Sequence, residues 1–260
     1  MSIHPTAIID SSAEIDSSAS IGPYALIGPR VVIGPDVEIK GHACIDKDTA
    51  IGRGSRVWPF ASVGADPQDL KYQGERTRLV IGEGVTIRES ATIHRGTEGG
   101  GGLTEIGDGC LIMATVHVAH DCRVGAGVIL SSYAVLAGHV EVGPGAIIGG
   151  LSAVHQFGRV GAYAFVGGGS GLSKDWPPYM AGASIGAREV LLAGPNVVGL
   201  KRREVSQDIV QALKGVFTLV CRNHRPLAEV LAEAEAQYGQ VAEAREFIEF
   251  YRSSQRGVYR

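Results

Sequence analysis

The sequence predicts a mainly β protein, a parallel β-helix of hexapeptide repeats over residues 1–194 followed by a small C-terminal α-helical domain over residues 195–260. Three observations support this prediction. Aliphatic residues recur at every sixth position, 37 glycines accompany only 6% aromatic residues, and helix-forming residues dominate from about Gly194 onward. Together they indicate short strands and tight turns around an aliphatic core, followed by a separate helical unit.

The six-residue repeat is the strongest pattern in the chain. From Ile3 to Val63 every sixth residue is Ile or Val, and the spacing returns at residues 81–93 and 106–172. Four places after most of these aliphatics stands a small or β-branched residue. A period of six does not match the α-helix, but it fits one short strand and one turn. Three such units close a triangular coil, with each aliphatic residue pointing inward.

Two segments interrupt the repeat, near residues 64–80 and 94–105. In the first, the phase would point Asp69 and Glu75 into the core, where an unpaired carboxylate is costly. In the second, the spacing from Ile93 to Ile106 is thirteen, one residue out of step. We expect both segments to be loops outside the β-helix, where rigid scaffolds often carry functional residues.

The C-terminal region has the signals of three helices. Ser206 is a candidate N-cap for a helix with apolar residues at helical spacing. Pro226 lies near the first turn of a second helix and Gly239 lies beyond its end, and a third helix covers residues 241–254.

Composition excludes several function classes. Lys and Arg total 24 against 27 Asp and Glu, a formal charge of -3, so no global field attracts nucleic acid. No apolar run is long enough for stable membrane insertion, and the first ten residues do not resemble a signal peptide. Four scattered cysteines without C-x-x-C spacing indicate free thiols in a cytoplasmic protein. We expect no cofactor and no metal ion.

Because one coil contains eighteen residues, the spacing of residues in the sequence predicts which of them lie side by side; this relation is called the winding rule here. One coil of three hexads makes residues n and n+18 neighbours about 4.8 Å apart. His120, Gly138 and Gln156 then share one column, and Asp121 and His139 share the next. Four of the chain's eight histidines are expected on this edge of the prism: His117, His120, His139 and His155.

This column has the chemistry of acyl transfer. His120 can act as a general base, the backbone N–H of Gly138 can stabilise an oxyanion, and Gln156 offers an amide beside them. Asp121 can orient His120, although adjacent side chains of an extended chain diverge. Cys122 has the spacing of a core residue, so it does not share a metal with His120. The alternative interpretation is a set of solvent-facing edge histidines.

Several strings resemble the UDP-N-acetylglucosamine O-acyltransferases of lipid A biosynthesis, within the hexapeptide-repeat transferase superfamily. They include "QDLKY" (68–72), "IRESATIHRGT" (87–97), "HVAHDC" (117–122), "LAGHV" (136–140), "AVHQF" (153–157) and "GLKRR" (199–203). The resemblance implies a left-handed β-helix and a homotrimer with active sites between subunits. It also implies transfer of an (R)-3-hydroxyacyl chain from acyl carrier protein to the 3-hydroxyl of UDP-N-acetylglucosamine.

The resemblance also implies roles for individual residues. The general base falls on His120 and the oxyanion amide on Gly138. Gly168 lies in a segment that sets acyl-chain length, where the absence of a side chain leaves room for a long chain. The basic Arg202 and Arg203 suit a diphosphate, with the acidic surface of a carrier protein as the alternative partner. The full set of implied substrate contacts is Gln68, Asp69, Lys71, His117, His139, His155, Gln156, Asn196, Arg202 and Arg203.

Three alternatives stay open from the sequence. The same base and oxyanion donor serve an enzyme that acylates a 3-amino UDP-sugar and makes an amide. A zinc hydratase on the same β-helix would use histidines from adjacent subunits, and His94, His117 and His120 are the candidate ligands. The third alternative is a binding scaffold without catalytic activity.

Overall fold

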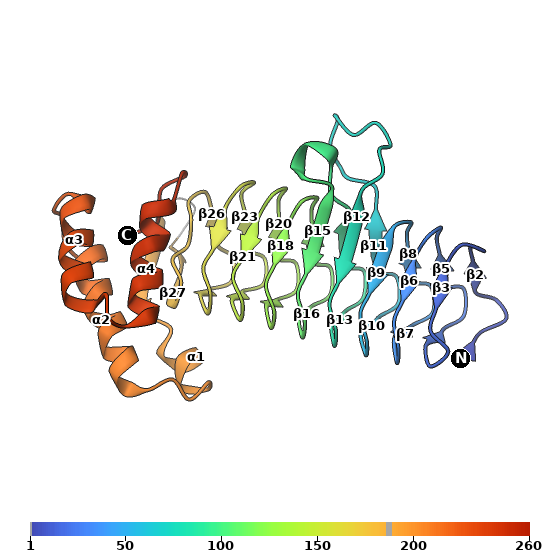
Figure 1. Ribbon diagram of the computed structural model, residues 1–260, viewed down its shortest axis with the longest axis horizontal. Helices are drawn as coiled ribbons and strands as arrows, with labels where there is room; N and C mark the ends of the chain where they lie inside the picture. Colours follow the sequence, from blue (N-terminus) through green and yellow to red (C-terminus); the bar gives the residue numbers. More distant parts are fainter. Residues whose placement is uncertain (1, 186–188) are drawn as a thin grey trace.

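The computed structural model describes residues 2–185 and 189–260, and its main body is a left-handed parallel β-helix with a triangular cross-section. Figure 1 shows an elongated prism with the N-terminus at one end and a group of helices at the other. The strands form three sheets along the faces of the prism, here called sheets A, B and C in the order in which the chain visits them. The predicted fold class is therefore confirmed.

The strands are mostly two residues long, and each sheet takes every third strand of the solenoid. Sheet A contains β1 (Ser2–Ile3), β4 (Ser20–Ile21), β7 (Glu38–Ile39), β10 (Arg56–Val57), β13 (Thr86–Ile87), β16 (Leu111–Ile112), β19 (Ile129–Leu130), β22 (Ile147–Ile148), β25 (Phe165–Val166), β27 (Met180–Ile185) and β28 (Glu189–Pro195). Sheet B contains β2 (Ile8–Ile9), β5 (Leu26–Ile27), β8 (Cys44–Ile45), β11 (Ser62–Ala65), β14 (Thr92–His94), β17 (His117–Val118), β20 (Val135–Leu136), β23 (Ala153–Val154) and β26 (Gly171–Leu172). Sheet C contains β3 (Glu14–Ile15), β6 (Val32–Ile33), β9 (Thr49–Ile51), β12 (Arg78–Ile81), β15 (Leu103–Ile106), β18 (Arg123–Val124), β21 (Glu141–Val142) and β24 (Arg159–Val160).

The register follows the winding rule. Val118 pairs with Leu136, and Leu136 pairs with Val154, so each partner lies one eighteen-residue coil further along. The inward aliphatic residues and the small residues four places after them form one continuous buried core. Cys122 belongs to this core and is fully buried, and burial raises the pKa of its thiol to about 12. The thiol is therefore an apolar filler at neutral pH.

The corners of the prism require a backbone conformation that the sequence analysis did not predict. At most corners from Ile21 onward, the third residue after the inward aliphatic has a positive φ, as at Asp121 (60°), His139 (61°) and Phe157 (60°). Glycine occupies the same position at other corners, for example Gly127 and Gly145. The left-handed conformation turns the chain sharply at each corner. It also controls which way the corner side chains point.

The two expected loops protrude from the prism beside each other (Figure 1). The first comprises residues 66–77, between β11 and β12, and the second comprises residues 95–102, between β14 and β15. The second loop contains a short 3-10 helix, η1 (Glu98–Gly100). The strands at both ends are longer than the usual two residues, so the loops themselves are shorter than the interrupted segments of the repeat.

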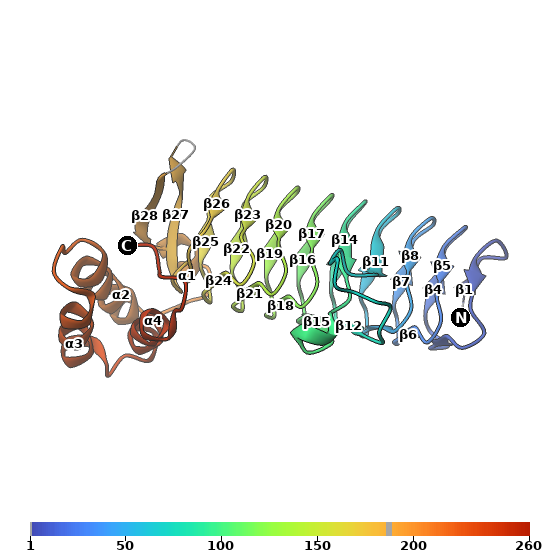
Figure 2. The ribbon, with the colours of Figure 1, turned by 90° about the horizontal axis from the view of Figure 1, so that it is seen from above.

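The C-terminal region begins with an antiparallel hairpin. Strands β27 and β28 extend sheet A beyond β25, as Figure 2 shows, and this hairpin was not predicted. Four helices follow: α1 (Val197–Lys201), α2 (Gln207–Cys221), α3 (Leu227–Tyr238) and α4 (Ala242–Ser253). Ser206 is the N-cap of α2 as predicted, since its side chain accepts a hydrogen bond from the Ile209 N–H. No helix in residues 2–185 or 189–260 is both long enough and apolar enough to cross a membrane.

Candidate active site

The candidate site lies on the edge between sheets B and C, here called the B–C edge. Its corners follow β17, β20 and β23, and they carry His120, Gly138 and Gln156 in one column. A Cβ atom placed on Gly138 would lie 2.6 Å from Cε1 and 2.8 Å from Nε2 of His120. The imidazole therefore lies directly against the α-carbon of Gly138. Any residue other than glycine at this position would displace the ring.

The N–H of Gly138 is free for the same geometric reason that prolines are tolerated elsewhere in the solenoid. Gly138 is the second residue after its inward aliphatic, and several other corners have proline at this position: Pro23, Pro29, Pro35, Pro59 and Pro144. Proline has no N–H, so the ladder does not use a donor here. Across the described residues, no hydrogen bond has the Gly138 N–H as its donor. This N–H is available to a developing oxyanion.

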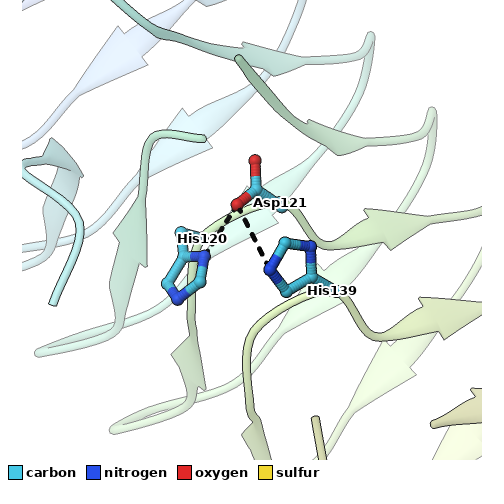
Figure 3. Close-up of side chains that lie close together, drawn as sticks. All are labelled: His120, Asp121 and His139. Atoms are coloured by element: carbon cyan, nitrogen blue, oxygen red, sulfur yellow. Dashed lines mark hydrogen bonds and ion pairs between the residues drawn. The ribbon is translucent and has the colours of Figure 1, made fainter. Parts of the chain in front are cut away.

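Asp121 orients His120 directly. The Nδ1–H of His120 donates to Oδ2 of Asp121 at 2.7 Å, drawn as a dashed line in Figure 3. The sequence analysis left this role open, because adjacent side chains of an extended chain diverge, and these two do not diverge. Asp121 is not extended: its φ of 60° turns the carboxylate back toward the preceding residue. With the proton on Nδ1, a neutral imidazole presents a lone pair at Nε2, as a general base requires.

The carboxylate of Asp121 is buried, with a side-chain exposure of 1%, and both of its oxygens accept hydrogen bonds. Besides His120, the N–H of Thr97 donates to Oδ1 at 2.8 Å and the Thr97 hydroxyl donates to Oδ2 at 2.7 Å. Ligand atoms of His120, Asp121 and His139 lie within 4.8 Å of one another, a spacing that also suits a metal ion. The carboxylate instead accepts three hydrogen bonds, one of them from His120, and this arrangement is typical of an anion that orients an imidazole.

His139 forms the next layer of the edge. Its Nε2 lies 3.8 Å from Oδ2 of Asp121, and its ring meets that of His120 edge-on at 5.1 Å (Figure 3). On the other side it stacks on Phe157, with ring centroids 4.4 Å apart. Burial lowers the pKa of His139, although the nearby Asp121 raises it. His139 therefore presents a largely neutral, polar edge to the site near pH 7.

Comparisons with known proteins identify the family. A family model described as UDP N-acetylglucosamine O-acyltransferase, domain 2, matches residues 175–259, and one described as bacterial transferase hexapeptide matches residues 103–138. A protein of Anaeromyxobacter sp. (strain Fw109-5) named acyl-[acyl-carrier-protein]--UDP-N-acetylglucosamine O-acyltransferase is 44% identical, with 100% of each chain covered. A protein of the same name from Chlamydia abortus is 48% identical and covers 100% of this chain and 92% of that one. This chain belongs to the UDP-N-acetylglucosamine O-acyltransferase family.

The solved structures agree with this family. The UDP-N-acetylglucosamine O-acyltransferase of Moraxella catarrhalis RH4 superposes with a TM-score of 0.95 at 41% identity, and all of both chains is covered. The family resemblance found in the sequence is therefore confirmed.

A cleft of about 390 Å³ lies between the two loops and the B–C edge. Asp69 and Lys71 line it from the first loop, and His139 and Phe157 line it from the edge. Asp69 accepts a hydrogen bond from the Lys71 N–H, which fixes the loop locally, and Gln68 is exposed on the same loop. The structure thus brings two of the predicted loop residues together with His139.

His117 does not line this cleft, and its ring packs against that of His94. Their ring centroids are 5.2 Å apart, and Nδ1 of His117 hydrogen-bonds to Oγ1 of Thr92 at 2.8 Å. His94 donates from Nδ1 to the Asp66 carbonyl, and burial lowers the pKa of both histidines. Within one chain, His94 and His117 do not gather with His120 into a metal-binding group among the described residues. The candidate zinc set of the hydratase alternative is therefore not assembled in a single chain.

Two residues of the site were missed by sequence reasoning. Arg95 is fully buried, donates to the Gly64 carbonyl and to Asp66, and hydrogen-bonds the Tyr72 hydroxyl at 3.1 Å, so it fastens the first loop to the prism. Thr97 holds Asp121. Both residues lie in the family string "IHRGT", and that string was the only signal, because neither fits the six-residue repeat.

Two other predicted contacts, His155 and Asn196, lie within hydrogen-bonding distance of residues that do not line the cleft. His155 is exposed, and its Nδ1 lies 3.1 Å from Nη2 of Arg256 in the C-terminal tail. Asn196 caps α1 by accepting from the Gly199 N–H, and it donates to the Tyr163 carbonyl.

Arg203 and Gly168 lie on the other two edges of the prism. Arg203 donates to the Gly145 carbonyl and packs over the ring of Tyr163, on the edge between sheets C and A, while Arg202 beside it is exposed. Gly168 follows β25 on the edge between sheets A and B. One chain therefore does not bring these residues to the cleft beside His139.

Proposed function

We propose that this protein transfers an (R)-3-hydroxyacyl group from acyl carrier protein to the 3-hydroxyl of UDP-N-acetylglucosamine, the first step of lipid A biosynthesis. The relatives' names specify the donor, the acceptor and an oxygen nucleophile. The single observation that supports the chemistry is the placement of the His120 imidazole against Gly138, with Nδ1 held by Asp121. The imidazole therefore lies beside the residue whose N–H is free.

The reaction follows from this geometry. Nε2 of His120 removes the proton from the sugar hydroxyl as its oxygen attacks the thioester carbonyl carbon. The Gly138 N–H stabilises the oxyanion of the tetrahedral intermediate, whose collapse breaks the C–S bond. The imidazolium returns its proton to the departing thiolate, so the enzyme ends unchanged. General-base assistance contributes about 10²–10⁴-fold, and one oxyanion donor contributes on the order of 10²–10³-fold.

We further propose that the working enzyme is a homotrimer. The outward residues of sheet A in the C-terminal half of the prism form an apolar stripe: Leu111, Ile129, Ile147 and Phe165. Sheet C instead presents alternating charges outward: Glu105, Arg123, Glu141 and Arg159. An apolar stripe along sheet A, beside the charged outer face of sheet C, suits packing against further copies of the chain. Such packing would bring Arg202, Arg203 and Asn196 of one copy toward the B–C edge of another.

The remaining substrate roles are part of the same proposal. Gln68, Asp69, Lys71, His117, His139, His155 and Gln156 would contact the sugar nucleotide from the side of the His120 column. Gly168 would leave room for a long acyl chain. The four cysteines are free thiols, which supports a cytoplasmic location where thiols stay reduced. The relatives' names specify O-acyl transfer, so neither the amide-forming alternative nor the hydratase alternative has support from them.

The test is a transfer assay with purified protein and acyl carrier proteins loaded with 3-hydroxyacyl chains of increasing length. The acceptors are UDP-N-acetylglucosamine and its 3-amino analogue. We expect ester formation on the first acceptor with a preference for long chains. Faster acylation of the amino analogue would contradict the assignment of UDP-N-acetylglucosamine as the acceptor. A preference for short chains would contradict the proposed role of Gly168.

A further inference from the structure

The loop formed by residues 95–102 lies against the carboxylate of Asp121 and also lines the cleft between the two loops. A Cβ atom on Gly100 would overlap the carboxylate group of Asp121, so the loop can close over this group only with glycine there. Thr97, at the start of η1, contributes both of its donors to the carboxylate. The loop therefore does more than connect two strands. It buries and fixes the anion that holds the base.

We propose that Thr97 is a positioning residue for the His120 base and that it acts through Asp121. This inference rests on the proposed function, in which His120 removes the proton of the sugar hydroxyl. Oδ2 of Asp121 accepts two hydrogen bonds, one from the Thr97 hydroxyl at 2.7 Å and one from His120 at 2.7 Å. The two donors share the negative charge of one oxygen atom, so the strength of one bond affects the other.

This sharing has a consequence for the protonation of His120. With the threonine hydroxyl in place, part of the carboxylate charge is neutralised, and the imidazolium form of His120 gains less from it. Removal of the hydroxyl leaves Oδ2 more basic, which stabilises the imidazolium and raises the pH at which the base becomes neutral. The N–H bond to Oδ1 is a backbone bond and survives substitution of the side chain.

The test compares the Thr97→Val and Thr97→Ser variants across pH. We expect Thr97→Val to move the acidic limb of the kcat/KM profile to higher pH by about half a unit to one unit. Its kcat should fall about tenfold, while KM for UDP-N-acetylglucosamine changes less than about threefold. Thr97→Ser, which retains a hydroxyl, should restore the wild-type limb. An unmoved limb in Thr97→Val would overturn the proposal.

A second pair of variants covers the case in which Thr97→Val does not fold. Gly100→Ala places a methyl group against the carboxylate and should push Asp121 away from His120. The imidazolium then loses its partner, so the acidic limb should move to lower pH and kcat should fall. Gly99→Ala is the matched control, because a Cβ there meets no atom within 4 Å, and its acidic limb should stay at the wild-type pH. Wild-type limbs in both glycine variants would contradict the proposal.

A measurement without turnover separates this inference from the proposed function. NMR of protein with labelled histidine reports the pKa of the His120 ring directly, with His120→Ala to identify the signal. The ring pKa should rise in Thr97→Val and return in Thr97→Ser. If no acyl transfer occurs but the ring pKa shifts as expected, the proposed function fails and the role of Thr97 stands. If transfer occurs and the ring pKa is unchanged, the role of Thr97 fails.

Discussion

At the scale of single residues, Gly138 combines two properties that no other amino acid offers together. It has no Cβ, so the His120 ring can lie 2.6 Å from where a Cβ would be. It also keeps the N–H that proline lacks at the same corner position elsewhere in the solenoid. The proposed base and the proposed oxyanion donor can be neighbours only because Gly138 meets both conditions.

This gives a first prediction. Gly138→Ala should lower kcat on the order of 10²–10³-fold, because the new methyl group displaces the imidazole from the oxyanion donor. Steady-state kinetics with UDP-N-acetylglucosamine and acyl carrier protein would measure it. Gly171→Ala is the control, since a Cβ there meets no atom within 4 Å, and its kcat should match the wild type. Equal kcat values for the two variants would contradict the arrangement.

The pairing of His120 with Gly138 could be predicted from the sequence, whereas the bond between His120 and Asp121 could not. The pairing depends only on the length of one coil, which the aliphatic repeat determines. The bond depends on the sign of φ at Asp121, and a six-residue hydrophobic pattern carries no information about that sign. Glycine recurs at the same corner position, at Gly127 and Gly145 for example, and was the available signal.

At the scale of elements, the first loop is fastened at both ends by charged groups. Arg95 holds its beginning through Asp66. Asp48 holds its end, with Arg30 at 2.7 Å and Arg76 at 3.0 Å. The hydrogen bonds from Arg30 and then Arg76 lower the pKa of Asp48 from 3.8 to about 2, against the effect of burial. A loop that carries Asp69 and Lys71 is thereby held in one position over the cleft.

The second prediction concerns this anchor. A carboxylate with a lowered pKa stabilises the fold above its usual pKa, and the contribution disappears as pH falls from 3.8 toward 2. Asp48→Asn should lose it at all pH values. We expect faster proteolysis within residues 66–77 and a severalfold higher KM for UDP-N-acetylglucosamine, with kcat little changed.

The control for Asp48→Asn is Asp36→Asn. Asp36 occupies the same kind of corner and pairs with Arg53 at 3.1 Å, but both side chains are more than half exposed. Exposed pairs contribute little, so this variant should keep the wild-type KM and cleavage rate. Equal behaviour of the two variants would show that Asp48 does not anchor the loop.

The loops could be anticipated at the element scale because they break a regular repeat. Asp69 and Glu75 fall at positions where the repeat would point them into the core, and this marks the first segment. The extra residue before Ile106 marks the second. The hairpin of β27 and β28 could not be anticipated, because its pairing is antiparallel and its residues no longer follow the period of six. Short α1 was missed for a similar reason, since five residues carry no helical periodicity.

At the scale of the whole molecule, the proposed functional residues are distributed over all three edges of the prism. The His120 column lies on one edge, Arg203 lies against Gly145 on the second, and Gly168 lies on the third. Residues on different edges of a filled prism cannot line one pocket in a single chain. The proposed threefold assembly would resolve this separation, because one copy would supply the B–C edge and another the arginine.

The third prediction tests this assembly by complementation. His120→Ala and Arg203→Ala chains should each be poorly active alone, and co-expression should recover activity in mixed trimers. Some sites would then combine an intact His120 from one chain with an intact Arg203 from the other. His120→Ala with Asp121→Asn is the control pair, because both changes lie on one edge and no mixed site is intact. Equal recovery in both pairs, or none in either, would contradict a shared site.

The most direct measurement of the central claim is the turnover of His120→Ala with acyl carrier protein and UDP-N-acetylglucosamine, at wild-type folding and oligomeric state. We predict that kcat falls by about 10²–10⁴-fold, because the hydroxyl loses its general base while the Gly138 N–H remains. Wild-type turnover in this variant would show that the His120 column is not the reaction centre.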